Sequence, residues 1–200
     1  ENACVLHYVE NNKQLKDNDL LLVDAGCEYE MYAADITRTF PINGKFSDEQ
    51  LAVYKIVLDA MNAAIDMVKP GNNIMQPQEV SEKVITEGLV KIGLLSGDPQ
   101  ELHKNGAYKE FYMHKIGHWL GLDVHDAGDY MEGEKYMKFK PGMITTIEPG
   151  IYISSKMDVD DKWKGIGVRI EDDILVTKEG NENLTKKVPS HPKEIESLMS

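Results

Sequence analysis

The chain contains the stretch Leu20-Leu21-Leu22-Val23-Asp24-Ala25-Gly26, an apolar run closed by a turn signal, which is typical of a buried strand. A second stretch rich in aromatic and β-branched residues, Tyr29 to Phe40, follows after Cys27-Glu28. The two stretches predict a β-hairpin or part of a meander.

Helices are expected next along the chain. Ser47 is a good helix N-cap, and Gln50 completes a capping box with it. Apolar residues then recur at helical spacing up to a Pro-Gly stop signal, at Leu51, Tyr54, Leu58, Met61, Ile65 and Val68. We expect a second helix over 77–93, because proline is favoured at a helix start. A short third helix is expected over 97–105.

After Phe111 the composition indicates strands again. We expect strands near 112–116, 143–148, 152–154 and 167–176, a surface loop over 154–164 and a terminal helix from His191. The order of strands, then helices, then strands predicts an α+β fold with a largely antiparallel sheet.

Composition limits the function classes. The chain of 200 residues, with 42% apolar and 28% charged residues, suits one globular domain. A formal net charge of −12 argues against nucleic-acid binding, because the surface repels phosphates. The longest apolar run, Leu20 to Val23, is too short to span a bilayer, so no membrane association is expected. Two cysteines, Cys4 and Cys27, form no disulfide or zinc pattern and favour a cytoplasmic location.

The first residues indicate a trimmed chain. The sequence opens at Glu1 without an initiator Met and runs directly into Cys4 to Val9, which is strand-like in composition. Because a domain seldom starts inside a strand, we expect a fragment of a longer protein.

Two aspartates are expected to meet at the mouth of the hairpin. Asp24 lies on the same strand face as Leu20 and Leu22. Asp35 lies on the same face as Thr37 in the next stretch. Two carboxylates side by side between apolar strands repel strongly unless a proton or a cation lies between them. A single buried aspartate has a simpler explanation, a hydrogen bond in a turn or a helix cap. The presence of two such aspartates makes this explanation weaker but does not remove it.

Histidines gather in one glycine-containing segment. His114 and His118 stand four residues apart, and His125 follows seven residues later. Gly117 and Gly121 favour a loop or an irregular turn over a helix. Structural histidines are commoner than metal ligands, so this spacing alone is a weak signal.

Two glutamates occupy strand positions. Glu148 closes an apolar strand directly before a Pro-Gly turn, where a carboxylate is poorly placed for a surface salt bridge. Glu171 shares one face of its strand with Arg169 and Asp173. The simpler explanation for Glu171 is an ion pair with Arg169 on that face.

Together these residues predict a two-metal site. The strands offer four carboxylates and the loop offers one or more histidines, which is too much negative charge for one divalent ion. They suit two ions roughly 3.5–4 Å apart, bridged by carboxylates. Ligands that are mostly oxygen favour Mn²⁺, with Co²⁺ or Zn²⁺ as alternatives in vitro.

Several motifs follow one another at fixed spacing: His7-Tyr8-x-Glu10-Asn11, Val23-Asp24-Ala25-Gly26-Cys27-Glu28-Tyr29, Asp35-Ile36-Thr37-Arg38-Thr39-Phe40, His114-x-x-x-His118-Trp119-Leu120-Gly121, Glu148-Pro149-Gly150 and Gly165-Ile166-Gly167-x-Arg169-Ile170-Glu171-Asp172-Asp173. In their order and spacing they resemble the bacterial aminopeptidase P family, which belongs with prolidase and methionine aminopeptidase to the pita-bread metallopeptidases. The likeness runs from His7 to the terminal helix.

The resemblance implies a pita-bread fold, a curved and mostly antiparallel sheet backed by helices. It also implies that residues 1–200 are a catalytic metallopeptidase domain that lacks the N-terminal domain of the family. Five residues match the family's ligands for two metal ions: Asp24, Asp35, His118, Glu148 and Glu171. Asp35 and Glu171 would bridge the two ions.

Other residues match the family's substrate contacts. His7, His114 and His125 correspond to active-site histidines that are not ligands, and Tyr152 and Arg169 match positions in or behind the substrate pocket. The catalytic residues implied are Glu148, as a proton shuttle, with His125, His7 and His114.

The function implied is removal of the first residue from peptides with proline at the second position. The likeness further implies that the full-length protein is a homo-oligomer. Two alternatives stay open: an Xaa-Pro dipeptidase, against which Trp119 after His118 argues, and a metal-free pita-bread module that binds peptides or proteins. The complete ligand set argues against the second.

Overall fold

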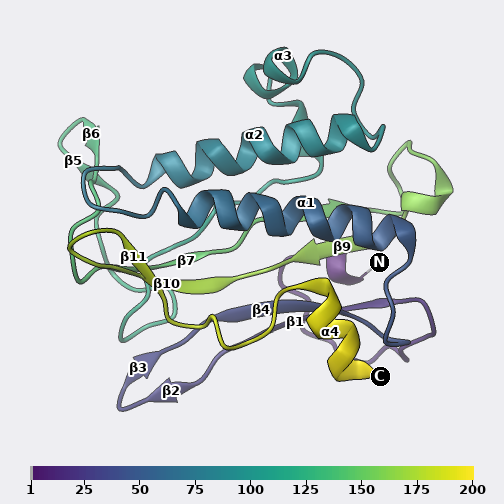
Figure 1. Ribbon diagram of the computed structural model, residues 1–200, viewed down its shortest axis with the longest axis horizontal. Coiled ribbons are helices and arrows are strands. Elements are labelled where there is room, and N and C mark those ends of the chain that lie inside the picture. The colour runs from purple at the N-terminus through teal and green to yellow at the C-terminus, as the bar shows by residue number, and fades with distance from the viewer. Residues whose placement is uncertain (1) are drawn as a thin grey trace.

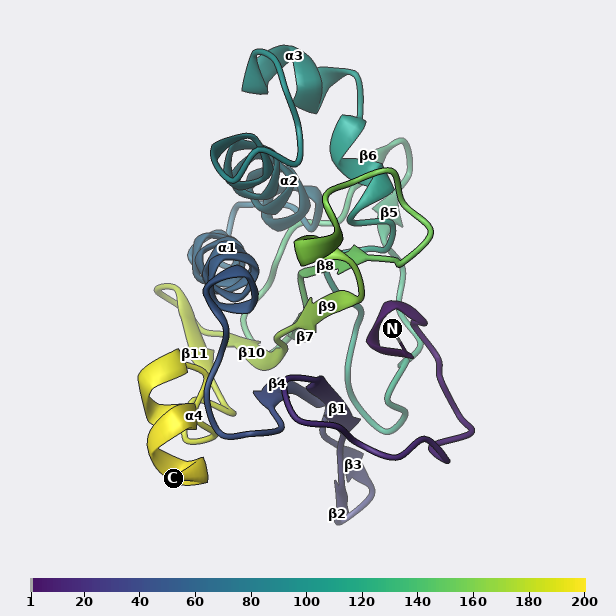
Figure 2. The same cartoon turned by 90° about the vertical axis from the view of Figure 1, so that its right-hand side faces the viewer.

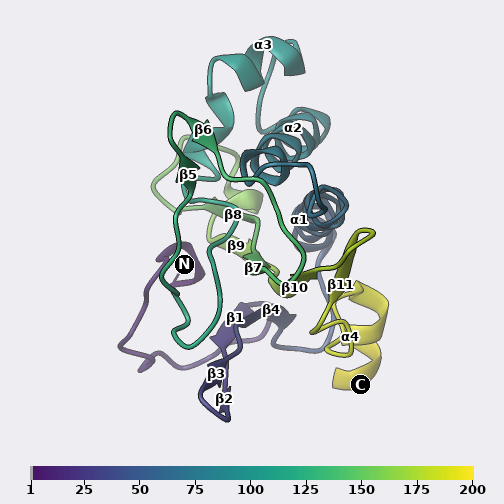
Figure 3. The same cartoon turned by 90° about the vertical axis from the view of Figure 1, so that its left-hand side faces the viewer.

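Two long helices lie side by side over a layer of short strands in this computed structural model, which describes residues 2–200 (Figure 1). The helices are α1 (Asp48–Ile65) and α2 (Met75–Lys91). Seen along the helices, the N-terminal segment lies on the opposite side of the strands (Figures 2 and 3). The paired strands of the described residues are antiparallel, which confirms the expected α+β class.

Helix α1 begins as the sequence predicts. The Ser47 hydroxyl accepts the Gln50 N–H, and the Gln50 side chain accepts the Ser47 N–H. The buried face of α1 meets α2 closely, because a Cβ on Gly88 would lie 2.5 Å from a methyl carbon of Ile56. The expected short helix is also present as α3 (Pro99–Lys104), which lies on the outer side of α2 (Figure 2).

The hairpin is confirmed in its main part. Strand β1 (Leu20–Ala25) pairs with β4 (Ile36–Pro41), so that Asp24 lies opposite Thr37. Between them a small hairpin, β2 (Glu28–Tyr29) and β3 (Tyr32–Ala33), projects from the body of the molecule (Figure 1). The single strand expected over 29–40 is therefore wrong. Glu30 and Met31 both have positive φ angles and make a two-residue turn.

The strand expected over 167–176 is also two strands. Strand β9 (Ile166–Arg169) pairs with β8 (Gly150–Ile153), whereas β10 (Asp172–Val176) pairs with β7 (Ile144–Ile147) and β11 (Asn181–Asn183). The break falls at Ile170 and Glu171. It forms there because the Glu171 N–H donates to the Thr37 carbonyl of β4, at 3.1 Å, and not to β7 or β8.

Two further strand expectations are wrong. Residues 112–116 form no strand. Residues 4–9 form no strand either: a short 3₁₀ helix, η1 (Asn2–Cys4), ends at Cys4, and the backbone after it is irregular. A hairpin of β5 (Met131–Glu132) and β6 (Lys135–Tyr136) was not expected. The remaining elements are η2 (Ala107–Glu110), η3 (Asp161–Trp163) within the expected surface loop, and the terminal helix α4 (Pro192–Met199).

An apolar core fills the space between the two helices and the strands. Val53 and Val57 of α1, Ile85 of α2 and Ile151 and Val168 of the strands are all fully buried within it. This core supports the side of β7 to β10 that faces the helices. Among residues 2–200, no helix combines the length and apolarity that a bilayer crossing requires.

Arg38 is a buried cation behind the sheet. Its guanidinium donates to Asp172 at 2.7 Å and to the backbone carbonyls of Glu171 at 2.6 Å, Val188 at 2.8 Å and Pro189 at 3.0 Å. These bonds tie the segment before α4 to the break between β9 and β10.

Candidate metal centre

Asp24 and Asp35 meet, as their strand positions predict. Asp24 ends β1, and Asp35 precedes β4 with its N–H donated to an Asp173 carboxylate oxygen at 3.2 Å. Both carboxyl groups line the same cavity, and each shifts the pKa of the other. Burial raises the pKa of Asp24, although Arg169 opposes it. Burial alone would raise the pKa of Asp35, but hydrogen bonds with His118 and Asp24 outweigh it and lower that pKa.

Glu171 sits at the break between β9 and β10, 1% exposed. Its Oε2 accepts the Thr37 hydroxyl at 2.6 Å, whereas its Oε1 is buried without a hydrogen-bond partner among the described residues. Burial, and then the charges of Glu148 and Asp35, raise the pKa of Glu171 to about 9. A buried carboxylate oxygen without a donor is unfavourable unless a proton or a cation meets it.

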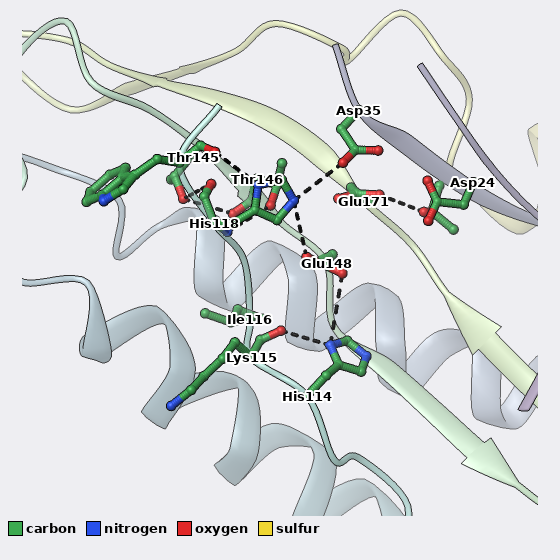
Figure 4. A network of polar contacts seen from close by, with 12 residues as sticks. Asp24, Asp35, His114, Lys115, Ile116, His118, Thr145, Thr146, Glu148 and Glu171 are labelled. Carbon is green, nitrogen blue, oxygen red and sulfur yellow. Dashed lines mark hydrogen bonds and ion pairs between the residues drawn. The ribbon is translucent and has the colours of Figure 1, made fainter. Parts of the chain in front are cut away.

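Glu148 follows β7 and faces the histidines (Figure 4). Its Oε1 lies 3.7 Å from the Nε2 of His118, and its Oε2 lies 4.0 Å from the Nδ1 of His114. Burial raises the pKa of Glu148 to about 7, although His118 and Arg169 oppose it. A carboxyl with a pKa near neutrality can take up and release a proton under ordinary conditions.

His118 presents one ring nitrogen to the carboxylates. Its Nδ1 lies 3.0 Å from the Trp119 carbonyl, which can only accept, so Nδ1 carries a hydrogen. Its Nε2 points between Asp35, at 3.4 Å, and Glu148. Burial alone would lower the pKa of His118, but hydrogen bonds to Asp35 and the Trp119 carbonyl outweigh it and raise that pKa.

His114 has both ring nitrogens occupied. Nδ1 lies 2.8 Å from the Lys115 carbonyl, and Nε2 lies 2.8 Å from the Tyr152 hydroxyl. Because burial lowers the pKa of His114 to about 4, the ring is neutral at pH 7 and Nε2 accepts from Tyr152. No nitrogen lone pair is left for a metal ion. This geometry suits a residue that contacts substrate.

Arg169 joins the two ends of the site. It donates to Asp24 at 2.5 Å, to the Thr37 hydroxyl at 3.3 Å and to the Tyr152 hydroxyl at 3.3 Å. Arg169 therefore pairs with Asp24, and the ion pair with Glu171 that its strand position suggested is not among the ion pairs of the described residues. A polar chain runs from Asp24 through Arg169 and Tyr152 to His114.

A cavity of about 690 Å³ collects these side chains. Its lining includes nine of the ten site residues that the sequence predicts: His7, Asp24, Asp35, His114, His118, His125, Glu148, Arg169 and Glu171. The tenth, Tyr152, bonds to His114 directly behind the lining. A second cavity of about 610 Å³ shares His7, Asp24, Asp35 and His125 with the first. The site therefore opens into two adjoining spaces.

The arrangement fits a metal ion. Donor atoms of Asp35, His118 and Glu171 lie within 4.8 Å of one another. The partnerless oxygen of Glu171 adds a reason why a cation belongs there. Asp24, held by Arg169, and Glu148, near His118, flank this three-residue group. The His125 ring packs edge-on against His118 at 4.3 Å.

Sequence reasoning missed three residues that position the site. Thr37 and Asp173 hold Glu171 and Asp35, and Gln78 accepts the Ile116 N–H at 2.6 Å. Gln78 gave a usable signal, because a polar side chain among the apolar positions of a helix face needs a buried partner.

Residues 1–178 match metallopeptidase family M24. The chain is 53% identical to the Xaa-Pro aminopeptidase of Haemophilus influenzae over 199 residues, 100% of this chain and 46% of that protein. The aminopeptidase PepP structure of Pseudomonas aeruginosa superimposes with a TM-score of 0.97 at 56% identity, covering 99% of this chain and 45% of that one.

A zinc-substituted aminopeptidase P of Escherichia coli, solved with its product, gives a TM-score of 0.95 at 48% identity, with 99% and 45% coverage. The expected pita-bread fold is confirmed by these neighbours. The chain spans less than half the length of these relatives.

Proposed function

This chain belongs to metallopeptidase family M24, and from this premise we propose that it removes the N-terminal residue from peptides with proline at the second position. The relatives named Xaa-Pro aminopeptidase support this substrate class. One observation carries the proposal: Glu171, which forms a possible metal-binding group with Asp35 and His118, has a buried carboxylate oxygen without a hydrogen-bond partner among the described residues.

We further propose that the site holds two divalent ions, bound by Asp24, Asp35, His118, Glu148 and Glu171. The mostly oxygen donor set favours Mn²⁺. When bound, such a pair supplies Lewis-acid activation of a water molecule and of the scissile carbonyl. Asp24 and Asp35 also present negative charge to the ammonium group of a peptide N-terminus.

Glu148 is the proposed proton carrier. Its position in the cavity beside both His114 and His118 suits a group that accepts a proton from water and passes it to the leaving nitrogen. That nitrogen belongs to a proline ring and has no N–H of its own. Like any amide nitrogen, it must gain a proton to leave as an amine, and Glu148 is the proposed donor of that proton.

The histidines are proposed to hold the substrate. His114, neutral and fixed by Tyr152, would line the proline side of the cavity with Arg169 behind it. His125 and His7, which border both cavities, would stabilise charge that develops on the carbonyl oxygen. Their place between the two cavities suits the junction between the first residue and proline.

The setting of the enzyme is also proposed. We propose that the chain acts as the catalytic part of a longer, homo-oligomeric protein, in keeping with the partial coverage of its relatives. We propose a cytoplasmic location, because the two cysteines of the sequence form no disulfide or zinc pattern.

Metal content and hydrolysis test the proposal together. The natural protein is loaded with Mn²⁺, its ions are counted by mass spectrometry, and release of the first residue from an Xaa-Pro-Xaa peptide is followed with and without chelator. About two ions per chain and chelator-sensitive release are expected. Faster turnover of Xaa-Pro dipeptides would assign a dipeptidase instead. A folded protein without ions would overturn the metal assignment.

A further inference from the structure

We propose that Gln78 of α2 is the positioning residue of the histidine loop, defined as residues 111–126. The inference rests on the proposed function, because it assigns His114 and His118 of this loop to the reaction. It adds a helix residue that contacts neither of them and acts on both through the backbone of Ile116.

Within the histidine loop, residues 113–117 have few backbone bonds to hold them in place. The part from 112 to 118 forms no strand, and single contacts fix it to β7 and β8. The carbonyls of Ile116 and His118 accept the N–H groups of Glu148 at 2.7 Å and Thr146 at 2.9 Å. These bonds restrain one edge of the segment only.

Gln78 restrains the other edge. Its side-chain carbonyl accepts the Ile116 N–H at 2.6 Å, so the peptide groups on both sides of Ile116 are held, one by α2 and one by β7. Gln78 is 6% exposed and Ile116 is equally buried. If the side chain is shortened or made apolar, the Ile116 N–H can regain a partner only through water in the cavity that both residues line.

The orientation of the Gln78 amide is itself fixed. Its NH₂ group donates to Glu82 at 2.9 Å, and the second Glu82 oxygen lies 3.3 Å from the His103 Nε2 on α3. A carboxylate only accepts, so the amide nitrogen must face Glu82 and the amide oxygen must face the loop. The network reaches from α3 to the cavity, which Gln78 also lines.

Ile116 lies midway between the two histidines that matter. His114 and His118 are each two residues away, and Figure 4 shows their rings converging on Glu148 from either side of Ile116. A shift of the Ile116 peptide therefore moves both rings relative to Glu148. Small misplacements of catalytic groups are costly for turnover.

Three variants of the natural, Mn²⁺-loaded protein test this role. Gln78→Leu removes the acceptor. Gln78→Glu keeps an acceptor for Ile116 but places two carboxylates together. The double variant Gln78→Glu with Glu82→Gln exchanges donor and acceptor and keeps both contacts. The control is Glu79→Gln, an exposed neighbour on the same helix.

Turnover of an Xaa-Pro-Xaa peptide and Mn²⁺ affinity are measured on all of them, with thermal melting as the check on folding. We expect both single Gln78 variants to lose about tenfold or more in kcat, with KM changed far less. The double variant is expected to recover to within about threefold of wild type. The control is expected to match wild type.

Wild-type kcat in Gln78→Leu would overturn the inference. A double variant whose kcat is no higher than that of Gln78→Glu would also overturn it, because Gln78 would then act through side-chain packing and not through its two hydrogen bonds. Inactive wild-type protein would overturn the proposed function instead. The Mn²⁺ affinity of the variants then tests the positioning role. Weaker Mn²⁺ binding in Gln78→Leu, restored in the double variant, supports this role. The same Mn²⁺ affinity in all the variants overturns it.

Discussion

The carboxylates and the histidines of the site are held in different ways. Asp24, Asp35 and Glu171 lie on or next to strands whose pairing fixes them, and Thr37 and Asp173 tie them together across the sheet. The histidine loop has no such pairing over 112–118 and depends on single side-chain and backbone contacts. Asp24, Asp35 and Glu171, the carboxylate half of the site, are thus part of the strand scaffold. The histidine loop, the loop half, is attached to that scaffold by individual contacts.

The electrostatics differ in the same sense. Burial raises the pKa values of Glu171 and Glu148, so the carboxylate half carries unfavourable negative charge without a cation. His114 in the loop is neutral and fully hydrogen-bonded. Changes in the carboxylate half should therefore alter stability and metal binding, whereas a change at His114, which is not a proposed ligand, should alter turnover alone.

Glu148 touches both halves and should give the largest effect. Glu148→Gln keeps the size of the side chain but removes its proton-carrying ability. We expect kcat to fall by about 10²–10⁴-fold while the melting temperature changes little. Steady-state kinetics with circular dichroism checks this. A variant with near-normal kcat would contradict the proposed role.

The carboxylate half makes stability depend on pH in metal-free protein. Glu171 has a folded-state pKa of about 9 against an ordinary value of 4.5. Between these values the native state binds a proton that the unfolded state has lost, so stability falls as pH rises. We expect a loss on the order of 3 kcal/mol between pH 5 and pH 8.

Chemical denaturation of chelated protein at both pH values measures this loss. Glu171→Gln should flatten the dependence and also abolish metal binding. Added Mn²⁺ should restore stability to the wild type at pH 8, because it binds the ionised site of the folded protein and not the unfolded chain. Equal slopes for wild type and variant would place the pH dependence elsewhere.

Within the loop half, His114 should respond in turnover alone. His114→Ala should lower kcat/KM for a proline peptide by about 10- to 100-fold, because its contact with Tyr152 and the substrate is lost. Mn²⁺ content and melting temperature should stay near the wild-type values. Loss of metal from this variant would instead make His114 a ligand and would erase the contrast between the two halves.

The smallest effect should come from the scaffold far from the site. Ser47→Ala removes the N-cap of α1 and should cost about 1 kcal/mol of stability. Turnover and Mn²⁺ affinity should stay unchanged, as measured beside urea denaturation. An activity loss here would show that the carboxylate half is coupled to α1 more tightly than its hydrogen bonds suggest.

Local signals in the sequence predict much of this molecule. The strand before Asp24 and the capping box of Ser47 depend on neighbouring residues, so both appear where expected. The meeting of Asp24 and Asp35 follows from strand periodicity alone. The remaining site residues are identified only by the family motifs, and their roles in metal binding and catalysis stay predictions.

Long-range contacts explain what the sequence does not predict. The segment near Ile116 has strand-like composition, but its N–H binds the side chain of Gln78, 38 residues away. The strand over 167–176 breaks because Thr37, 134 residues from Glu171, takes that residue's N–H and donates its hydroxyl. Neither partner can be chosen from a local pattern, because many polar residues lie equally far along the chain.

The buried Arg38 has a consequence for how the protein is synthesised. Two of its carbonyl partners, Val188 and Pro189, lie 150 and 151 residues further along the chain. While the ribosome is still making that stretch, the guanidinium of β4 lacks these acceptors and stays in water. Strand β4 can pair with the nearby β1 early, but the Arg38 side chain can complete its hydrogen bonds only late in translation. A chain released before residue 188 would be an unfinished product, open to proteases.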